Sequence, residues 1–370
     1  MKVLHISTFS PTQCGIATYC EDLIKHQPGV QPLLLRMTFK PDGLASYFWH
    51  TVEVGSPQSY QDAVEAINQS DIDVVSLQHE FGIFGGQDGD WVTLFAEGIK
   101  KPLVTTLHTT YPTFTPLKRN IVECLVKRSK AIIVLSEASR RFLCSQFETG
   151  DKVKLIRHGI PAVEFHHPRE STFRHELACD LVFVSAGHMR FSKGYETALS
   201  ALALFKESGI KFRYLILGTS QPHWDPEGVV PKMLTGLVHE LNLKEEVLLI
   251  PKFLPLEDLV RYIQAADIGL VTYTEHDQVS SGILPMILGC GRLAVATRFA
   301  FAESLAGSVD GLFFCELNDP KSLCEAIHRA AKHIDPASTI MRSNYDRTRD
   351  WLWENTAQRY KEVFEQTAVL

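Results

Sequence analysis

The chain has 370 residues, of which 45% are hydrophobic and 22% charged, and its formal net charge is -6 at pH 7. This composition is typical of a soluble globular protein, and the length exceeds what one ordinary core holds, so we expect two domains. The net negative charge argues against nucleic acid as a partner. No apolar run approaches the roughly 20 residues that a membrane span needs.

The eight cysteines show no Cys-x-x-Cys pair and no dense spacing, which predicts reduced thiols in the cytosol. The N-terminus passes from Met1 directly into an apolar, strand-like segment and does not read as a signal peptide. We therefore predict a cytoplasmic protein, with peripheral contact at the inner membrane face as an open alternative through a local basic patch. The oligomeric state is not fixed by the sequence.

Short apolar runs alternate with segments of helical period along the whole chain. In the first half the expected strands are 3–7, 31–37, 74–78, 103–107, 131–135 and 153–156, with helices at 18–26, 59–68 and 117–128. Periodicity is lost over residues 159–172, which we assign to an inter-domain linker. The alternation then restarts, with strands at 181–185, 212–217, 247–250, 268–273, 293–297 and 312–314 and helices at 195–208, 232–241 and 256–266. This pattern predicts the α/β class, with two doubly wound, mainly parallel sheets.

We expect three parts: a Rossmann-like domain over residues 1–163, a second over 175–348, and a C-terminal helix over 349–370. Two halves of similar size joined by a linker imply a central cleft. Aromatic residues recur at helical spacing in the terminal segment, and core packing is the simplest interpretation of that stripe.

A polar loop of small residues follows the expected strand 268–273 and leads into a short apolar helix. Ser280, Ser281 and Gly282 offer hydroxyls and backbone N–H groups at the start of that helix, a pattern suited to an anion. The carboxyl end of a strand is also where α/β folds place their ligands. An ordinary serine N-cap explains the same residues equally well.

Two cations follow the first strand of the second half. Arg190 and Lys193 stand three residues apart, close to the start of a helix, and can converge on a pair of phosphates. A solvated surface loop is the alternative interpretation. This loop and the serine loop follow strands of the same sheet, so each strengthens the functional interpretation of the other.

Two histidines stand at the ends of neighbouring apolar strands in the first half, where they would face the cleft. They are His79, which Glu80 follows, and His108. Packed, hydrogen-bonded histidines are the alternative. The three residues could start a metal site, but no further ligand stands at a suitable spacing, so we predict no metal. The chain has no Walker A loop, no G-x-S-x-G elbow and no G-x-G-x-x-G fingerprint.

Taken in order, these features resemble the retaining GT-B glycosyltransferases of family 4 over nearly the whole chain. The shared motifs are the glycine loop after the first strand, the histidine after a Thr-Thr-Leu strand, His-Gly at the domain junction, Lys193-Gly194, Ala265-Ala266-Asp267-Ile268, the Gly289-Cys290-Gly291 turn, Glu303 and Asp310-Gly311. More narrowly, the stretch from His79 to Gly86 and the pattern Gln278-x-Ser280-Ser281-Gly282 look like a bacterial subgroup of that family.

The resemblance implies a GT-B fold, with an acceptor domain, a nucleotide-sugar donor domain and a C-terminal helix that crosses back to the first domain. It implies that Arg190 and Lys193 hold the nucleotide diphosphate, that the 280–282 loop caps it, and that Gly15 sits against the phosphates. His108 would line the donor-sugar and acceptor site. Further contacts to the nucleotide sugar are expected from His79, Glu80, Phe253 and Glu303.

The chain departs from the family pattern in the serine loop. The family usually carries two glutamates eight positions apart, and here those positions hold Gln278 and Met286. Gln278 can still hydrogen-bond a sugar hydroxyl as part of the catalytic site, but without charge. Met286 cannot accept from a ribose hydroxyl, and Glu303 is a candidate replacement. Backbone contacts in the loop around Phe253 would select the base.

The predicted function is that of a retaining glycosyltransferase in surface or exported glycan synthesis. It would move a sugar from a UDP- or GDP-sugar to a hydroxyl of a glycan, a lipid-linked sugar or a small molecule, without a tightly bound cofactor. One alternative is a non-catalytic sugar-nucleotide-binding protein, which the missing glutamates leave open and the retained Arg190, Lys193 and His108 weigh against. The other is a sugar-nucleotide epimerase, for which the sequence offers few cleft carboxylates beyond Glu80.

Overall fold

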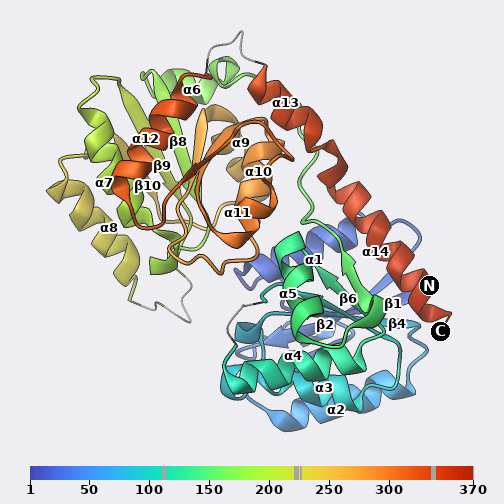
Figure 1. The fold of residues 1–370 in the computed structure, drawn as a ribbon. Coiled ribbons are helices and arrows are strands. Elements are labelled where there is room, and N and C mark those ends of the chain that lie inside the picture. Colours follow the sequence, from blue (N-terminus) through green and yellow to red (C-terminus); the bar gives the residue numbers. More distant parts are fainter. Residues whose placement is uncertain (111–113, 221–224, 226, 335–338, 370) are drawn as a thin grey trace. The chain divides into compact units, whose positions relative to one another are not determined.

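The computed structural model describes residues 1–110, 114–220, 225, 227–334 and 339–369 (Figure 1). The chain forms two compact units. Unit 1 comprises Met1–Gly159 together with Trp353–Leu370, and unit 2 comprises Ile160–Leu352. The chain therefore passes between the units twice, once after Gly159 and once after Leu352. The sequence pattern predicts domain limits at residues 163 and 349.

Unit 1 is built on a parallel sheet of seven strands in the order β3-β2-β1-β4-β5-β6-β7. The strands are β1 (Lys2–Ser7), β2 (Gln31–Thr38), β3 (His50–Glu53), β4 (Val74–His79), β5 (Leu103–Leu107), β6 (Ala131–Val134) and β7 (Val153–Leu155). The strand order reverses between β1 and β4, and α/β sheets bind ligands at the carboxyl ends of strands beside such a point.

Helices cover both faces of this sheet, as the alternation of side chains along β1 shows. Leu4 and Ile6 join the core that includes residues of α2, α3 and α4, whereas Val3 joins the core that includes α14. The helices of unit 1 are α1 (Gly15–Lys25), α2 (Pro57–Gln69), α3 (Val92–Gly98), α4 (Pro116–Arg128), α5 (Glu137–Gln146) and α14 (Trp353–Ala368). The terminal helix α14 packs along α1, β4 and β5 (Figure 1).

Unit 2 repeats the design with a parallel sheet of six strands in the order β10-β9-β8-β11-β12-β13. The strands are β8 (Leu181–Ala186), β9 (Phe212–Leu217), β10 (Val247–Ile250), β11 (Ile268–Val271), β12 (Leu293–Thr297) and β13 (Leu312–Cys315). The helices are α6 (Thr172–Glu176), α7 (Tyr195–Lys206), α8 (Val229–Glu240), α9 (Leu256–Ala265), α10 (Ile283–Gly289), α11 (Ala300–Ser304), α12 (Pro320–Ala331) and α13 (Ile340–Arg347). Here the order reverses between β8 and β11.

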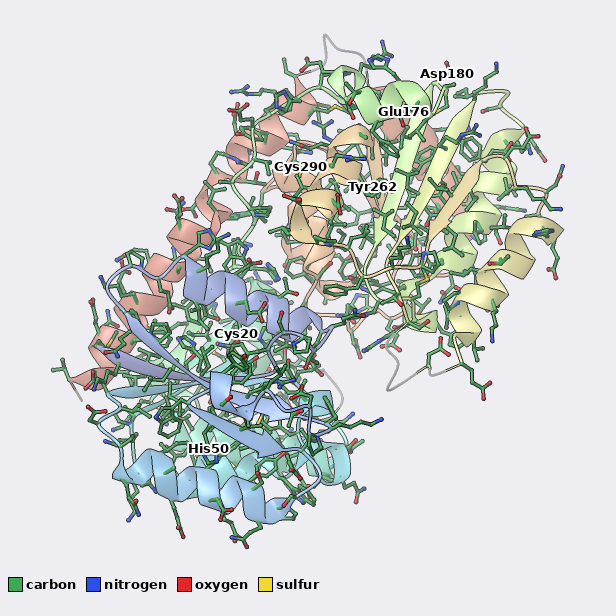
Figure 2. All side chains as sticks on the ribbon, turned by 180° about the vertical axis from the view of Figure 1, so that it is seen from behind. Cys20, His50, Glu176, Asp180, Tyr262 and Cys290 are labelled. Carbon is green, nitrogen blue, oxygen red and sulfur yellow. The ribbon has the colours of Figure 1, made fainter. Side chains whose placement is uncertain are left out.

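The predicted class, an α/β chain with two doubly wound parallel sheets, is confirmed. One strand was missed, since β3 is a short edge strand with a single buried residue, Val52, and no apolar run. All eight cysteines lie in the described part of the chain and none forms a disulfide; Cys20 lies inside unit 1 and Cys290 inside unit 2 (Figure 2). None of the described helices is both long and apolar enough to cross a bilayer.

Candidate functional site

Three loops at the carboxyl edge of the unit 2 sheet are joined into one surface. They follow β8, β11 and β12 and span residues 187–194, 272–282 and 298–303, the last of which includes the first turn of α11. The N–H of Thr274 donates to the carbonyl of Ser192 at 3.1 Å, and the N–H of Phe301 donates to the carbonyl of Gln278 at 3.0 Å. The reversal of strand order between β8 and β11 lies beneath them, so these loops occupy the ligand-binding edge of the fold.

Lys193 and Ser281, predicted as separate candidates, are connected through Tyr273. The Nζ of Lys193 donates to the Tyr273 hydroxyl at 2.8 Å and lies 4.2 Å from the centroid of the same ring. The Tyr273 hydroxyl lies 3.1 Å from the Ser281 Oγ, which accepts a hydrogen bond from the Leu284 N–H at 3.3 Å. Ser281 thus serves as a cap of the α10 first turn, and its hydroxyl also reaches the lysine through the tyrosine.

The turn that carries Arg190 and Lys193 depends on Gly194. Gly194 has φ +63°, and a Cβ at this position would lie 2.0 Å from the carbonyl oxygen of Thr272. The Thr272 hydroxyl is 2.9 Å from the carbonyls of both Lys193 and Gly194. The Lys193 N–H donates to the Arg190 carbonyl at 3.0 Å, so the two cations belong to one tight turn.

The remaining residues of the serine loop use part of their hydrogen-bonding capacity within the loop. Gln278 Nε2 donates to the carbonyl of Ser280 at 2.8 Å, and Gly282 is exposed at the start of α10. The Glu303 carboxylate lies between His276 and Arg298. One of its oxygens is 3.4 Å from His276 Nε2 and the other is 3.6 Å from an Arg298 guanidinium nitrogen.

Phe253 lies beyond β10 and exposes 41% of its surface. Its ring centroid is 6.4 Å from that of His188, which follows β8. Burial, with the nearby charge of Arg190, lowers the pKa of His188 to about 4, so this ring is neutral at pH 7. An exposed aromatic ring beside a neutral imidazole offers an apolar face at the same edge of the sheet.

In unit 1, His79 is packed in an aromatic environment. Its side chain is completely buried, with the Phe81 ring edge-on at 4.8 Å and the Phe84 ring stacked at 5.9 Å. Burial lowers the pKa of His79 to about 3. Among the described residues neither ring nitrogen has a hydrogen-bond partner, so the surroundings of His79 are those of a core residue.

His108 is also neutral but is held by a polar partner. Its Nε2 lies 2.9 Å from Gln78 Oε1, and because an amide oxygen only accepts, the ring nitrogen donates. The Tyr19 ring stands edge-on at 4.7 Å. Burial, with His158 and His79 nearby, lowers the pKa of His108 to about 3. His108 is therefore a fixed neutral imidazole at the end of β5.

Glu80 is held by Thr109 and begins a loop that requires glycine at two positions. The Thr109 hydroxyl donates to the Glu80 carboxylate, which joins the segments after β4 and β5. Further along, the Gly85 N–H donates to the Tyr60 hydroxyl at 2.9 Å. Gly86 has φ +84°, and a Cβ there would meet the side chain of Asp90 at 1.8 Å. A Cβ at Gly85 would lie 1.9 Å from the carbonyl oxygen of Val54, so packing explains Gly85 and Gly86 of the His79–Gly86 motif.

Gly15 is the first residue of α1, and local packing does not explain it. A Cβ at Gly15 would meet no heavy atom within 4 Å. The position lies beside β1, where the unit 1 sheet reverses its strand order. Across the part of the chain that the structure describes, no group of three histidine, cysteine, aspartate or glutamate residues is arranged to hold a metal ion.

A cavity of about 590 Å³ lies away from the three loops of unit 2. Its lining includes Arg174, Asp180 and Lys211, at the amino ends of β8 and β9, and Figure 2 marks Asp180 at that end of the unit. The Arg174 guanidinium is itself buried and paired with Asp267 at 2.6 Å. Because α/β folds bind ligands at the opposite edge, we do not place the functional site there.

Three side chains that shape these sites were not among the predicted residues: Tyr273, Gln78 and Thr109. The apolar run 268–273 predicts Tyr273 as the last residue of a strand, but β11 ends at Val271, which leaves Tyr273 in the loop. Gln78 is a fully buried polar residue within β4, and that unusual position was the signal available in the sequence.

Models of two related sequence families match the two halves of the chain. The model described as "Glycosyltransferase Family 4" matches residues 15–163, and the model described as "Glycosyl transferases group 1" matches residues 179–333. The chain is a family 4, group 1 glycosyltransferase. No curated protein matches it by sequence.

Solved structures show that the glycosyltransferase has the GT-B fold. HepE from Anabaena, in complex with UDP, superposes with a TM-score of 0.77 at 16% identity, covering 99% of this chain and 100% of that one. Sucrose-phosphate synthase from Thermosynechococcus elongatus has a TM-score of 0.78 at 16% identity and 99% coverage of both chains. The UDP-forming α,α-trehalose-phosphate synthase from Burkholderia xenovorans, in complex with glucose-6-phosphate, has a TM-score of 0.71 at 13% identity, with 99% and 100% covered.

Proposed function

We propose that this glycosyltransferase is a retaining enzyme that takes its sugar from a nucleotide-diphosphate sugar and binds that donor on unit 2. The observation that carries the proposal is the turn with Arg190 and Lys193, at the point where the unit 2 sheet reverses its strand order. Two cations held in one turn match the negative charge of a diphosphate. UDP in the HepE structure and UDP-glucose in another structure of the same protein support this choice of ligand class.

The chemical task is to stabilise the negative charge that develops on the diphosphate as the sugar–phosphate bond breaks. In the proposed mechanism the sugar passes through an oxocarbenium-like state, and the acceptor hydroxyl attacks from the face that the diphosphate leaves. Arg190, Lys193 and the N–H groups of the 280–282 loop would supply the positive charge. Removing one such donor is expected to cost about 3 kcal/mol in kcat/KM, by analogy with oxyanion-hole deletions.

Further contacts to the donor are proposed from residues around this turn. Gln278 and Glu303 would hydrogen-bond sugar or ribose hydroxyls, and the exposed ring of Phe253 would contact the base. From unit 1, Gly15 would lie against the phosphates, since its missing side chain leaves open space at the start of α1. UDP- and GDP-sugars are both donor candidates.

The acceptor is proposed to present a hydroxyl to residues of unit 1. His108 is a neutral imidazole fixed by Gln78, and Glu80 is a carboxylate fixed by Thr109. Both can hydrogen-bond hydroxyls, His108 those of the donor sugar and the acceptor and Glu80 those of the nucleotide sugar. His79 is the weakest of the proposed contacts, because its side chain is fully buried. We propose a role in surface or exported glycan synthesis on the family resemblance alone.

Thermal unfolding in the presence of UDP, GDP and their sugars tests the proposal. A ligand at 100 times its Kd should add about 2.7 kcal/mol of stability if it binds only the folded state. The double variant Arg190→Ala/Lys193→Ala should fold and lose that response. A wild-type protein that responds to none of these nucleotides would refute nucleotide-sugar binding and favour a different donor class.

A further inference from the structure

Tyr273 is the structural partner of the cation at the proposed donor site. Its side chain is 6% exposed, and the Phe299 ring lies against it at 4.6 Å. The Thr297 hydroxyl donates to the Tyr273 carbonyl at 2.7 Å, which fixes the backbone as well. Packing on Phe299 therefore holds the ring and a hydrogen bond holds the backbone, so the hydroxyl is a fixed point to which Lys193 donates at 2.8 Å.

A hydrogen bond to a fixed hydroxyl restricts a lysine side chain to one position before any ligand binds. Its side chain has four flexible bonds, and ordering it costs free energy at the moment of binding. An ammonium group has three donors, and the Tyr273 hydroxyl takes one of them. The ammonium also lies 3.6 Å from where a Cβ of Gly187 would be, at the end of β8. The Lys193 ammonium is thus held between the Tyr273 hydroxyl and Gly187, at the carboxyl end of β8.

The choice of a hydroxyl as partner has a consequence for charge. A carboxylate partner would neutralise the lysine, whereas a tyrosine hydroxyl accepts a hydrogen bond and leaves the positive charge in full. After Tyr273, Gln278 in the loop and Met286 in α10 occupy the two positions at which the family resemblance implies glutamates. The arrangement therefore combines a fixed lysine with an uncharged residue at both of these positions.

We propose that Tyr273 is a positioning residue for the diphosphate of the donor, and that it acts through Lys193. This inference rests on the proposed function. The hydroxyl orders the Lys193 ammonium before the ligand arrives, so that binding does not have to order that side chain. Tyr273 itself contacts the phosphates only through the lysine.

Calorimetric titration of the full chain with four probes tests the inference: UDP, GDP and the nucleosides uridine and guanosine. Tyr273→Phe keeps the ring, its packing on Phe299 and its face toward Lys193, and removes only the hydroxyl. We expect it to weaken binding of the preferred diphosphate about tenfold, the effect of one side chain left to be ordered on binding. Affinity for the matching nucleoside, which has no phosphate, should stay the same.

A double-mutant cycle separates positioning from a general structural effect. In the Lys193→Ala background, Tyr273→Phe should cause no further loss of diphosphate affinity, because its effect passes through the lysine. Tyr214→Phe is the matched control. It removes a buried hydroxyl that donates to Ser185 at 2.9 Å in the same unit, and it should leave all four affinities unchanged.

The outcomes are distinct. Selective loss of diphosphate affinity in Tyr273→Phe, abolished in the Lys193→Ala background, supports the inference. Undiminished diphosphate binding by Tyr273→Phe overturns it and leaves the proposed function standing. Equal loss for nucleoside and diphosphate, or a loss that persists without Lys193, overturns it as well, since the hydroxyl would then be structural. A wild-type protein that binds neither UDP nor GDP overturns the proposed function and this inference together.

Discussion

Acidification from pH 7.5 to pH 5.5 is expected to destabilise unit 1 strongly. Three of its histidines, His5, His79 and His108, are almost completely buried, and burial lowers the pKa of each to about 3. In the unfolded chain a histidine has a pKa of about 6.5. Below pH 6.5 the unfolded state therefore binds protons that the folded state does not, so stability falls as the pH falls.

The size of the effect follows from the two sets of pKa values. Between pH 7.5 and pH 5.5 each such histidine should cost about 1.3 kcal/mol, and the three together roughly 4 kcal/mol. That is a large share of the 5–15 kcal/mol typical of a folded domain. The loss should continue until the pH approaches the folded-state pKa values near 3.

Urea denaturation at the two pH values, followed by tryptophan fluorescence, measures the change. The variant His79→Phe replaces the ring between Phe81 and Phe84 with one that does not titrate. It should reduce the pH dependence by about 1.3 kcal/mol, and the transition it affects belongs to unit 1. His166→Gln is the matched control, because that histidine is half exposed and lies in unit 2. Equal stability of the wild type at both pH values would refute the reasoning about buried neutral histidines.

Three substitutions give further predictions. Gly15→Ala should change the urea midpoint little, because its Cβ meets no atom within 4 Å. It should lower the affinity for the diphosphate, which is proposed to lie against this residue, and titration with UDP and GDP measures that affinity. Gly194→Ala should destabilise unit 2 by about 2 kcal/mol or more, since φ is +63° and the Cβ would lie 2.0 Å from a carbonyl oxygen; denaturation that matches wild type would contradict this. Tyr360→Phe removes a hydroxyl that lies 2.9 Å from that of Tyr19 and 3.0 Å from a threonine of β5, and should cost about 2 kcal/mol in unit 1 stability in the same assay.

The two sheets were predictable because parallel strands covered on both faces read as continuous apolar runs. β4, β5 and β8 are buried along their whole length, and each was found in the sequence. Elements with a weak apolar pattern were not. β3 buries only Val52, and α5 buries only Ser139 and Leu143, so neither carries a periodic signal that stands out from its neighbours.

The candidate site was predictable as far as topology determines it. Arg190 and Lys193 follow a strand directly, and the carboxyl ends of parallel strands meet at one edge, so their position follows from the strand assignment. The partner of Lys193 could not be found in this way, because it depended on where β11 ends. Had the strand reached residue 273, the tyrosine would have been a sheet residue instead of a loop residue.

The two histidines show a second limit. His79 and His108 follow apolar strands in the same manner, yet one packs between phenylalanine rings and the other donates to Gln78. The difference comes from the path of the 80–86 loop, which folds Phe81 and Phe84 back onto His79. Loop paths of this kind depend on contacts between residues far apart in sequence, and a single sequence does not display them.

Calorimetric titration of three proteins with UDP and GDP tests the central claim most directly. The three are the wild type, Lys193→Ala and Lys244→Ala, the last an exposed lysine of unit 2 that precedes β10 at the opposite edge of the sheet. We predict that the wild type and Lys244→Ala bind one of the nucleotides with the same affinity and that Lys193→Ala binds it about 30-fold more weakly, the effect of one charge-assisted hydrogen bond. Equal binding by all three proteins, or no binding by the wild type, would contradict the account.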